Sequence, residues 1–158
     1  MSQYVLQAQD VAIHYGGVKA LDGVDMTLEK GQIRGLIGPN GAGKSTVIDA
    51  ITGRRPLTRG KVTLMGQDVS HLRAVERRAR GLSRSFQRTS IFHGMTVRAQ
   101  VELASYKMGM QHSAEDAEAV LKELDLDRLG HIVAEDLGYG EQRRLDLALA
   151  LVGRPQVL

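Results

Sequence analysis

Apolar and polar residues alternate with a period of two in the first third of the chain, which predicts short β-strands. Turn signals separate the first strands, at Gly16–Gly17 and at Glu29–Gly31. The expected strands are Val5–Gln9, Val11–Tyr15, Val24–Leu28, Ile33–Ile37, Lys61–Met65 and Leu82–Phe86. The run Ile33–Ile37 ends at Gly38, where the pattern changes.

From Lys44 onward the apolar spacing becomes helical, with Val47, Ile48 and Ile51 on one face. Ser70 and Thr96 are expected to cap two later helices, and Ser113 is expected to open a capping box with Asp116. The expected helices are 44–52, 70–80, 96–104, 113–124 and 142–152.

The composition is that of one soluble globular domain: 158 residues, of which 42% are hydrophobic and 25% charged. The absence of cysteine excludes thiol catalysis, zinc–thiolate sites and disulfides, and it fits a reducing compartment. No apolar run approaches the roughly 20 residues of a membrane span. The opening residues Met1–Asp10 are polar and carry no secretion signal, so we expect an intracellular chain.

The charge is distributed unevenly, although the formal net charge is only +3. Between Arg54 and Arg98 there are eleven lysines and arginines against two carboxylates. Aromatic residues make up 4% of the chain and tryptophan is absent, which argues against a stacking platform for single-stranded nucleic acid. Contact with phosphate, an acidic partner, or simply a solvated arginine-rich face all stay open.

The segment Gly38-Pro39-Asn40-Gly41-Ala42-Gly43-Lys44-Ser45 fits the P-loop pattern at every fixed position. Its glycines let the backbone curl, so that successive N–H groups and the start of the following helix face a phosphate chain. We expect Lys44 to reach the β- and γ-phosphates and the Ser45 hydroxyl to ligate Mg²⁺. The alternative is a glycine-rich turn that only joins strand to helix.

Three further segments, in this order around the P-loop, resemble the ATP-binding subunit of ABC transporters. They are His14–Leu21, Ser85-Phe86-Gln87 and Leu137–Arg144. The resemblance extends over essentially the whole chain and looks closest to the branched-chain amino acid import subfamily. It implies an α/β P-loop fold with a small antiparallel β subdomain (1–30 and 60–69), a nucleotide core (31–59 and 70–87), a helical subdomain (88–137) and a signature helix (138–152).

The same resemblance implies a role for each motif residue. Tyr15 would stack on adenine, and Gln87 would complete the Mg²⁺ shell and sense the γ-phosphate. The signature segment would address ATP that is held by a second subunit, although it departs from the common L-S-G-G-Q. The implied nucleotide-binding residues are Tyr15, Gly38, Asn40, Gly41, Ala42, Gly43, Lys44, Ser45 and Thr46, and the signature residues are Gly138, Tyr139, Gly140 and Glu141.

The resemblance also implies an Asp-Glu pair after the signature helix, the Walker B aspartate and the catalytic glutamate. The chain reaches Pro155–Leu158 where that strand should begin, so we expect a truncated subunit with an open sheet edge. None of the five histidines lies where the family has its switch histidine. These are His14, His71, His93, His112 and His131.

We therefore expect an ATP-binding subunit of an importer for branched-chain amino acids or similar small solutes, with ATP and Mg²⁺ as cofactors. Its implied partners are transmembrane permease subunits and a second ATP-binding subunit, on the cytoplasmic face of the cell membrane, and no nucleic acid is expected. One alternative is a fragment that binds ATP without hydrolysing it. The other, a soluble ABC protein acting on DNA or ribosomes, has only the basic stretch to support it.

Overall fold

The computed structural model describes residues 3–158, which divide into two compact units. One unit comprises the described residues through Leu82 together with Val157, and the other comprises Ser83–Gln156 with Leu158. Residues 1 and 2, which the expected β subdomain includes, lie outside the described residues. The division after Leu82 falls inside the segment 70–87 that the resemblance assigns to the nucleotide core.

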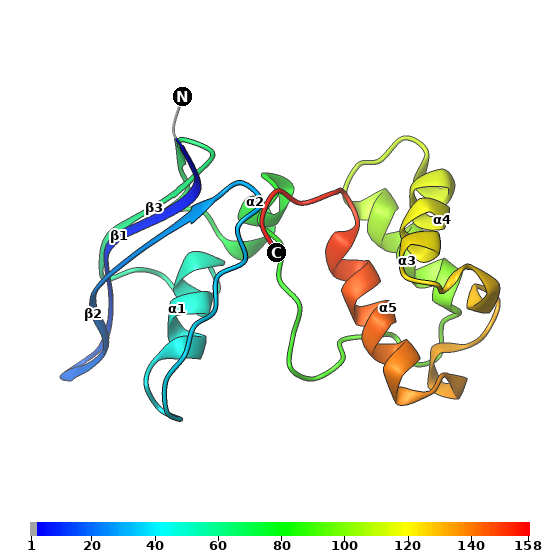
Figure 1. The fold of residues 1–158 in the computed structure, drawn as a ribbon, viewed down its shortest axis with the longest axis horizontal. Coiled ribbons are helices and arrows are strands. Elements are labelled where there is room, and N and C mark those ends of the chain that lie inside the picture. The colour runs from blue at the N-terminus through cyan, green and yellow to red at the C-terminus, as the bar shows by residue number, and fades with distance from the viewer. Residues whose placement is uncertain (1–2) are drawn as a thin grey trace. The chain divides into compact units, whose positions relative to one another are not determined.

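The first unit contains a four-stranded antiparallel sheet in the order β2-β1-β3-β4 (Figure 1). Its strands are β1 (Tyr4–Tyr15), β2 (Val18–Glu29), β3 (Arg59–Leu64) and β4 (Gln67–Asp68). Strand β1 includes both expected strands, Val5–Gln9 and Val11–Tyr15. Asp10 lies between them in a β-bulge, with a φ of 48°, so the strand continues through this position. The Asp10 N–H donates to the Asp25 carboxylate at 2.8 Å, so the residue that leaves the ladder still has a partner.

Helix α1 (Lys44–Ile51) packs beside this sheet in the first unit (Figure 1). The helix buries Val47, Ala50 and Ile51, whose spacing of three and four places them on one face. They join a core made with sheet residues such as Leu6 and Val62, which are 2% and 0% exposed. The helix expected from Lys44 is confirmed.

Helix α2 (Ala74–Ala79) is shorter than the helix expected over 70–80, and Ser70 does not cap it. The Ser70 hydroxyl accepts the Val62 N–H at 2.8 Å and donates to the Asp68 carboxylate at 2.6 Å. The hairpin of β3 and β4 therefore uses this side chain, and the helix begins only after Arg73. There the Glu76 carboxylate accepts the Arg73 N–H at 2.9 Å, and this bond lowers the pKa of Glu76.

Two expected strands, Ile33–Ile37 and Leu82–Phe86, are not formed. A strand needs a neighbour to accept and donate its backbone hydrogen bonds, and no strand in the described part of the chain pairs with either segment. Among the residues of these two segments, only Leu82 forms a β-bridge, which is a single parallel bridge with Val157. The Gly81 carbonyl accepts the Val157 N–H there at 3.1 Å. The side chains of Ile33 and Ile37 are 99% and 98% exposed.

The second unit is helical (Figure 1). Its helices are α3 (Val97–Lys107), α4 (Ser113–Glu123) and α5 (Tyr139–Leu151), with short 3-10 turns η1 (Asp127–Leu129) and η2 (Ala134–Asp136) between α4 and α5. Each of the three helices contributes fully buried side chains, among them Val101, Leu121 and Leu145, to a separate core. None of these helices, nor any other within residues 3–158, has the length and apolar character needed to span a membrane.

The helix starts observed in the second unit agree only in part with those predicted from the sequence. The Thr96 cap is confirmed, since its hydroxyl accepts the Ala99 N–H at 3.2 Å. The Ser113 cap is wrong: Ser113 is the first helical residue, and His112 precedes it without a side-chain capping bond. Helix α5 begins at Tyr139, three residues before the start that the apolar pattern predicts and close to position 138, which the resemblance implies. The Glu141 carboxylate accepts the N–H of Gly138 at this start.

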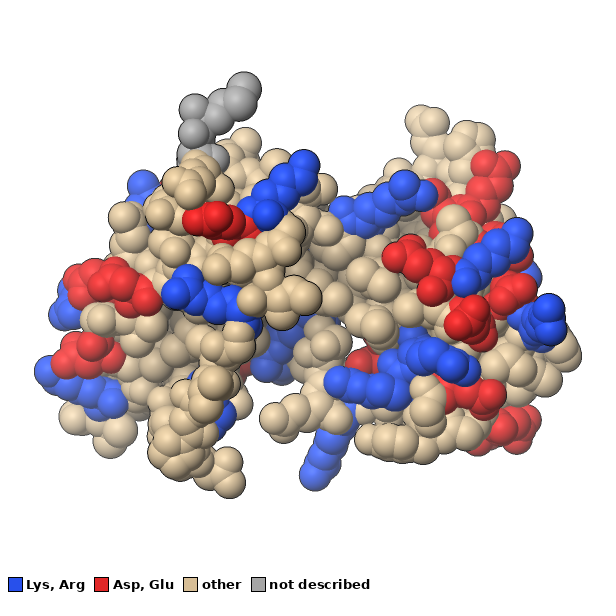
Figure 2. Space-filling view, viewed as in Figure 1, with Lys and Arg blue, Asp and Glu red and all other residues tan. Residues whose placement is uncertain are grey.

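Carboxylates neutralise part of the basic stretch between Arg54 and Arg98. Arg59 pairs with Asp10 at 2.7 Å, and this hydrogen bond lowers the pKa of Asp10. Arg98 likewise pairs with Glu118. On the face that Figure 2 shows, acidic and basic side chains intermingle within each unit.

Arg77 is only 1% exposed and ties α2 to the end of α1. Its guanidinium donates to the carbonyls of Ala50 and Ile51, at 2.9 and 2.6 Å, which are the last carbonyls of α1. It also donates to the carbonyls of Ser70 and Leu72, at 2.8 and 3.0 Å. Burial lowers the pKa of Arg77, and Asp68 opposes that shift.

Replacing Arg77 by methionine should lower the free energy of unfolding by about 3 kcal/mol, because it leaves buried carbonyls without donors. Urea denaturation followed by circular dichroism measures this loss. Arg73→Met is the matched control: the Arg73 side chain is 85% exposed, so the loss should stay below about 1 kcal/mol. Equal losses in the two variants would contradict this role for Arg77.

Candidate nucleotide site

The P-loop segment leads directly into α1, and Gly43 is the residue that makes the transition. Gly43 has a φ of 82°. A β-carbon there would lie 3.1 Å from Leu21 Cδ2 and 3.4 Å from the Ala20 carbonyl oxygen. The loop therefore packs so closely on β2 that only glycine fits without strain.

The first turn of α1 presents donors to the loop. Val47 is the first residue whose N–H bonds to the helix cap, at 2.9 Å from the Gly43 carbonyl. The N–H groups of Lys44, Ser45 and Thr46 consequently have no acceptor one turn earlier. Together with the positive end of the helix dipole, these donors make this end of α1 suitable for a phosphate.

Lys44 lies over the same loop. Its ammonium donates to the carbonyl oxygens of Gly38 and Pro39, at 2.6 Å each. These bonds hold the positive charge on the loop, beside the N–H groups at the start of α1. The loop thus brings one cation and a set of backbone donors to one place, which is the chemistry that a polyphosphate requires.

Ser45 offers a hydroxyl in the first turn of α1, and its side chain is exposed. Mg²⁺ prefers oxygen ligands and usually completes its shell with water and substrate phosphates. Among residues 3–158 no cluster of three or more acidic or histidine side chains could hold a metal alone. Ser45 therefore fits a magnesium ion that arrives with a nucleotide, and Mg²⁺ would supply charge neutralisation at the phosphates.

Tyr15 ends β1 in the same unit and is 49% exposed. The Arg55 guanidinium lies 6.0 Å from the centroid of the Tyr15 ring. The neighbouring His14 N–H donates to the Thr58 hydroxyl at 2.9 Å. The segment that follows α1 therefore supports the end of β1, a contact that no local sequence signal indicated.

Gln87 lies in the second unit, where its side chain is exposed and its backbone belongs to no helix or strand. The residues around it are nevertheless held. The Phe86 carbonyl accepts a hydrogen bond from Arg143, and the Ser90 N–H donates to the Asp146 carboxylate at 2.9 Å. Both partners belong to α5, so this helix fixes the backbone on either side of Gln87.

The signature residues Gly138, Tyr139, Gly140 and Glu141 lie together at the start of α5. Tyr139 is 78% exposed. The Glu141 carboxylate accepts the Gly138 N–H at 2.8 Å, and the Gln142 amide donates to the carbonyls of Ala134 and Leu137. The acid that replaces the common glutamine thus serves as a helix cap, and it places a negative charge at this end of α5.

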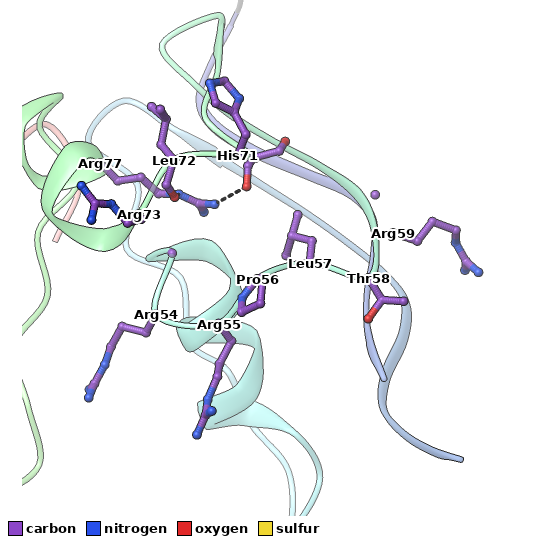
Figure 3. Close-up of a pocket in the computed structure, with 13 residues that line it drawn as sticks. Arg54, Arg55, Pro56, Leu57, Thr58, Arg59, His71, Leu72, Arg73 and Arg77 are labelled. Carbon is purple, nitrogen blue, oxygen red and sulfur yellow. Dashed lines mark hydrogen bonds between the residues drawn. The ribbon is translucent and has the colours of Figure 1, made fainter. Parts of the chain in front are cut away.

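A hollow of about 530 Å³ lies at the opposite end of α1 from the P-loop (Figure 3). Five of its thirteen lining residues are arginines and none is acidic. Arg54 and Arg55 nevertheless extend away from the wall formed by Pro56 and Leu57, while the Arg77 guanidinium turns to a neighbouring carbonyl (Figure 3). The arginines do not converge on a ligand here, so the P-loop is the better phosphate site.

A glycine-rich loop opening a helix on a sheet, followed by a separate helical unit with a glycine-rich helix start, defines the nucleotide-binding cassette of a P-loop protein. The comparisons with known proteins identify the kind of cassette. The sequence profile described as "ABC transporter" matches residues 21–158. The chain belongs to this family.

Among its relatives are ATP-binding proteins of high-affinity branched-chain amino acid transport. BraF of Pseudomonas aeruginosa is 30% identical and LivG of Escherichia coli K12 is 32% identical; each match covers all of this chain and 69% of the relative. The ADP conformation of MJ1267, an ATP-binding cassette of an ABC transporter, matches 98% of this chain with a TM-score of 0.88 at 27% identity. That match covers 66% of the solved chain. The 158 residues thus span about two thirds of these relatives.

These findings confirm the resemblance and the fold class: the chain is a partial ABC cassette with an α/β P-loop fold. ABC cassettes are ATPases, which bind ATP, generally with Mg²⁺. ATP-binding subunits of importers act with membrane permease components and dimerise.

Replacing Glu141 by alanine should destabilise the second unit by about 1 kcal/mol, because the Gly138 N–H loses its acceptor. Glu141→Gln keeps an acceptor of the same reach and should lose less. Thermal unfolding of the purified variants measures the difference. If Glu141→Ala proved as stable as the original chain, the capping role would be wrong.

Proposed function

We propose that this chain is the nucleotide-binding part of an ABC importer subunit, which couples ATP binding and hydrolysis to the uptake of branched-chain amino acids or similar small solutes. The P-loop at the start of α1, with Lys44 bonded over it, is the single observation that carries the nucleotide part of this proposal. The named relatives support the transport part.

Within this proposal each site residue has a defined task. The backbone of Gly38–Thr46 and the Lys44 ammonium hold the phosphates, the Ser45 hydroxyl contributes one oxygen to Mg²⁺, and Tyr15 stacks on adenine. Gln87 supplies a second oxygen near the γ-phosphate. The signature segment Gly138–Glu141 faces ATP that is held by a second subunit. Catalysis by such a site consists of positioning the phosphates and neutralising their charge.

The proposed partners are transmembrane permease subunits and a second ATP-binding subunit, which place the chain on the cytoplasmic face of the cell membrane. The segment from Gln87 to about Arg98 is proposed to contact the permease, and its exposed Phe92 and His93 fit that role.

Lys44→Ala should weaken Mg-ATP binding about tenfold to a hundredfold, because it removes a charge-assisted contact worth about 1.5–3 kcal/mol. Isothermal titration calorimetry of the 158-residue chain measures the change. Lys61→Ala, which removes an exposed lysine from β3 in the same unit, is the control and should leave the affinity unchanged. An unaltered ATP affinity in Lys44→Ala would exclude the phosphate site.

Tyr15→Ala should weaken ATP by about 1–3 kcal/mol and leave inorganic triphosphate unaffected, since only the nucleotide has a base to stack. Tyr15→Phe retains the ring and should bind ATP nearly as the original chain does. Competition of each ligand against a fluorescent ATP analogue separates the two affinities. Equal losses for both ligands would show that Tyr15 only supports the fold.

One feature of the sequence favours the alternative, ATP binding without hydrolysis. The 158 residues contain no Asp-Glu pair after the signature helix. We propose that these 158 residues by themselves bind ATP without turning it over at a significant rate, because they lack the acidic pair that the resemblance assigns to orienting the attacking water. Phosphate release by the purified chain tests this. Turnover that disappears in Lys44→Ala would overturn it, because that loss excludes a contaminating ATPase.

A further inference from the structure

The aromatic ring of Tyr15 has a cation beside it. The Arg55 guanidinium lies over this ring, 6.0 Å from its centroid, which is the distance range in which a cation is attracted to the face of an aromatic ring. Tyr15 is 49% exposed, so the ring keeps surface that a ligand can reach. The Arg55 side chain extends away from the wall of the arginine-rich hollow (Figure 3), and the contact that the structure gives it is with Tyr15.

The backbone from which the Arg55 side chain extends is fixed at the end of α1. The N–H groups of Arg54 and Arg55 both donate to the Asp49 carbonyl, at 2.9 and 3.2 Å. Gly53 turns the chain just before them with a φ of 74°, and a β-carbon at this position would lie 2.8 Å from the Leu72 carbonyl oxygen. The turn is therefore closely packed, and it sets the direction of the segment that carries Arg55.

The same segment is bonded to the end of β1. The Thr58 N–H donates to the Ala12 carbonyl at 2.8 Å, and the His14 N–H donates to the Thr58 hydroxyl at 2.9 Å. Tyr15 follows His14 directly, so these bonds reach the residue beside the ring. The phosphate-facing N–H groups lie at the other end of α1, about 12 Å away along a helix of 8 residues. One short helix thus connects the phosphate loop to the support of the Tyr15 ring.

We propose that Arg55 is a positioning residue for the adenine base: it restrains the Tyr15 ring from one face, so that the ring is ready for stacking before a nucleotide arrives. A side chain that is already restrained loses less conformational entropy on binding, and this raises affinity without a new contact to the ligand. The inference rests on the proposed function in one respect, the stacking of Tyr15 on adenine. Arg55 should therefore affect the binding of a ligand only when that ligand carries a base.

Calorimetric titrations of the 158-residue chain with Mg-ATP and with magnesium triphosphate test this role. Arg55→Met should weaken ATP binding about twofold to fivefold, as expected for loss of an exposed cation–π contact, and should leave triphosphate binding unchanged. Arg55→Lys keeps a cation that can lie over the ring, so it should recover most of the ATP affinity. Arg54→Met is the matched control, because it removes the same charge from the neighbouring exposed position and should leave both affinities unchanged.

Substitutions of Tyr15 separate positioning from a general effect of charge. In a chain that carries Tyr15→Ala, Arg55→Met should cause no further loss of ATP affinity, because the ring on which Arg55 acts is gone. In a chain that carries Tyr15→Phe, which keeps an aromatic ring, the loss should remain. Circular dichroism of each variant checks that the chain is folded.

Two results would show that Arg55 acts without the ring: a loss in Arg55→Met that is equal for ATP and triphosphate, or one that persists in the chain with Tyr15→Ala. Either result would overturn the inference. An unchanged ATP affinity in Arg55→Met, together with a clear loss in Tyr15→Ala, would overturn it as well. Failure of the proposed function is distinct, because Lys44→Ala or Tyr15→Ala would then bind ATP as the original chain does.

Discussion

The unpaired N–H groups at the start of α1 are the feature on which the nucleotide site depends. Every helix leaves such donors, but here Gly43 packs against Leu21 and fixes the direction in which they point. Lys44 adds a cation at the same end. The opposite end of α1 is also held in place. The Arg77 guanidinium donates hydrogen bonds to the last carbonyls of the helix, and its positive charge complements the negative end of the helix dipole. A short helix is thus held at both ends by charge and hydrogen bonding.

The parts of the site that the sequence predicted are the local ones. The P-loop could be found because its eight residues are contiguous and its glycines, Lys44 and Ser45 each have a physical reason to be there. The contacts that sequence reasoning missed join distant residues: Arg55 with Tyr15, and Arg143 and Asp146 with the loop around Gln87. Nothing in the composition of either segment marks its partner. Glu141 lies between these two cases. The sequence marked it as a signature residue, but only the structure showed that its carboxylate caps α5.

The difference between local and long-range contacts also explains which parts of the fold the sequence predicted. Thr96 caps its helix as expected because the capping bond reaches only three residues, whereas Ser70 is taken by β3 instead. The apolar run Ile33–Ile37 has the pattern of a strand, but a strand exists only with a neighbour, and residues 3–158 provide none beside it. Its isoleucines, Ile33 and Ile37, are therefore almost fully exposed. Patterning identified the run as apolar and could not supply the partner that would bury it.

Backbone hydrogen exchange with and without Mg-ATP tests the central claim most directly, because it locates the nucleotide among the described residues. The account predicts that ATP slows exchange in Gly41–Thr46 and leaves Gly53–Gly60, which lines the arginine-rich hollow, unaffected. Protection confined to Gly53–Gly60, with free exchange at the start of α1, would contradict it.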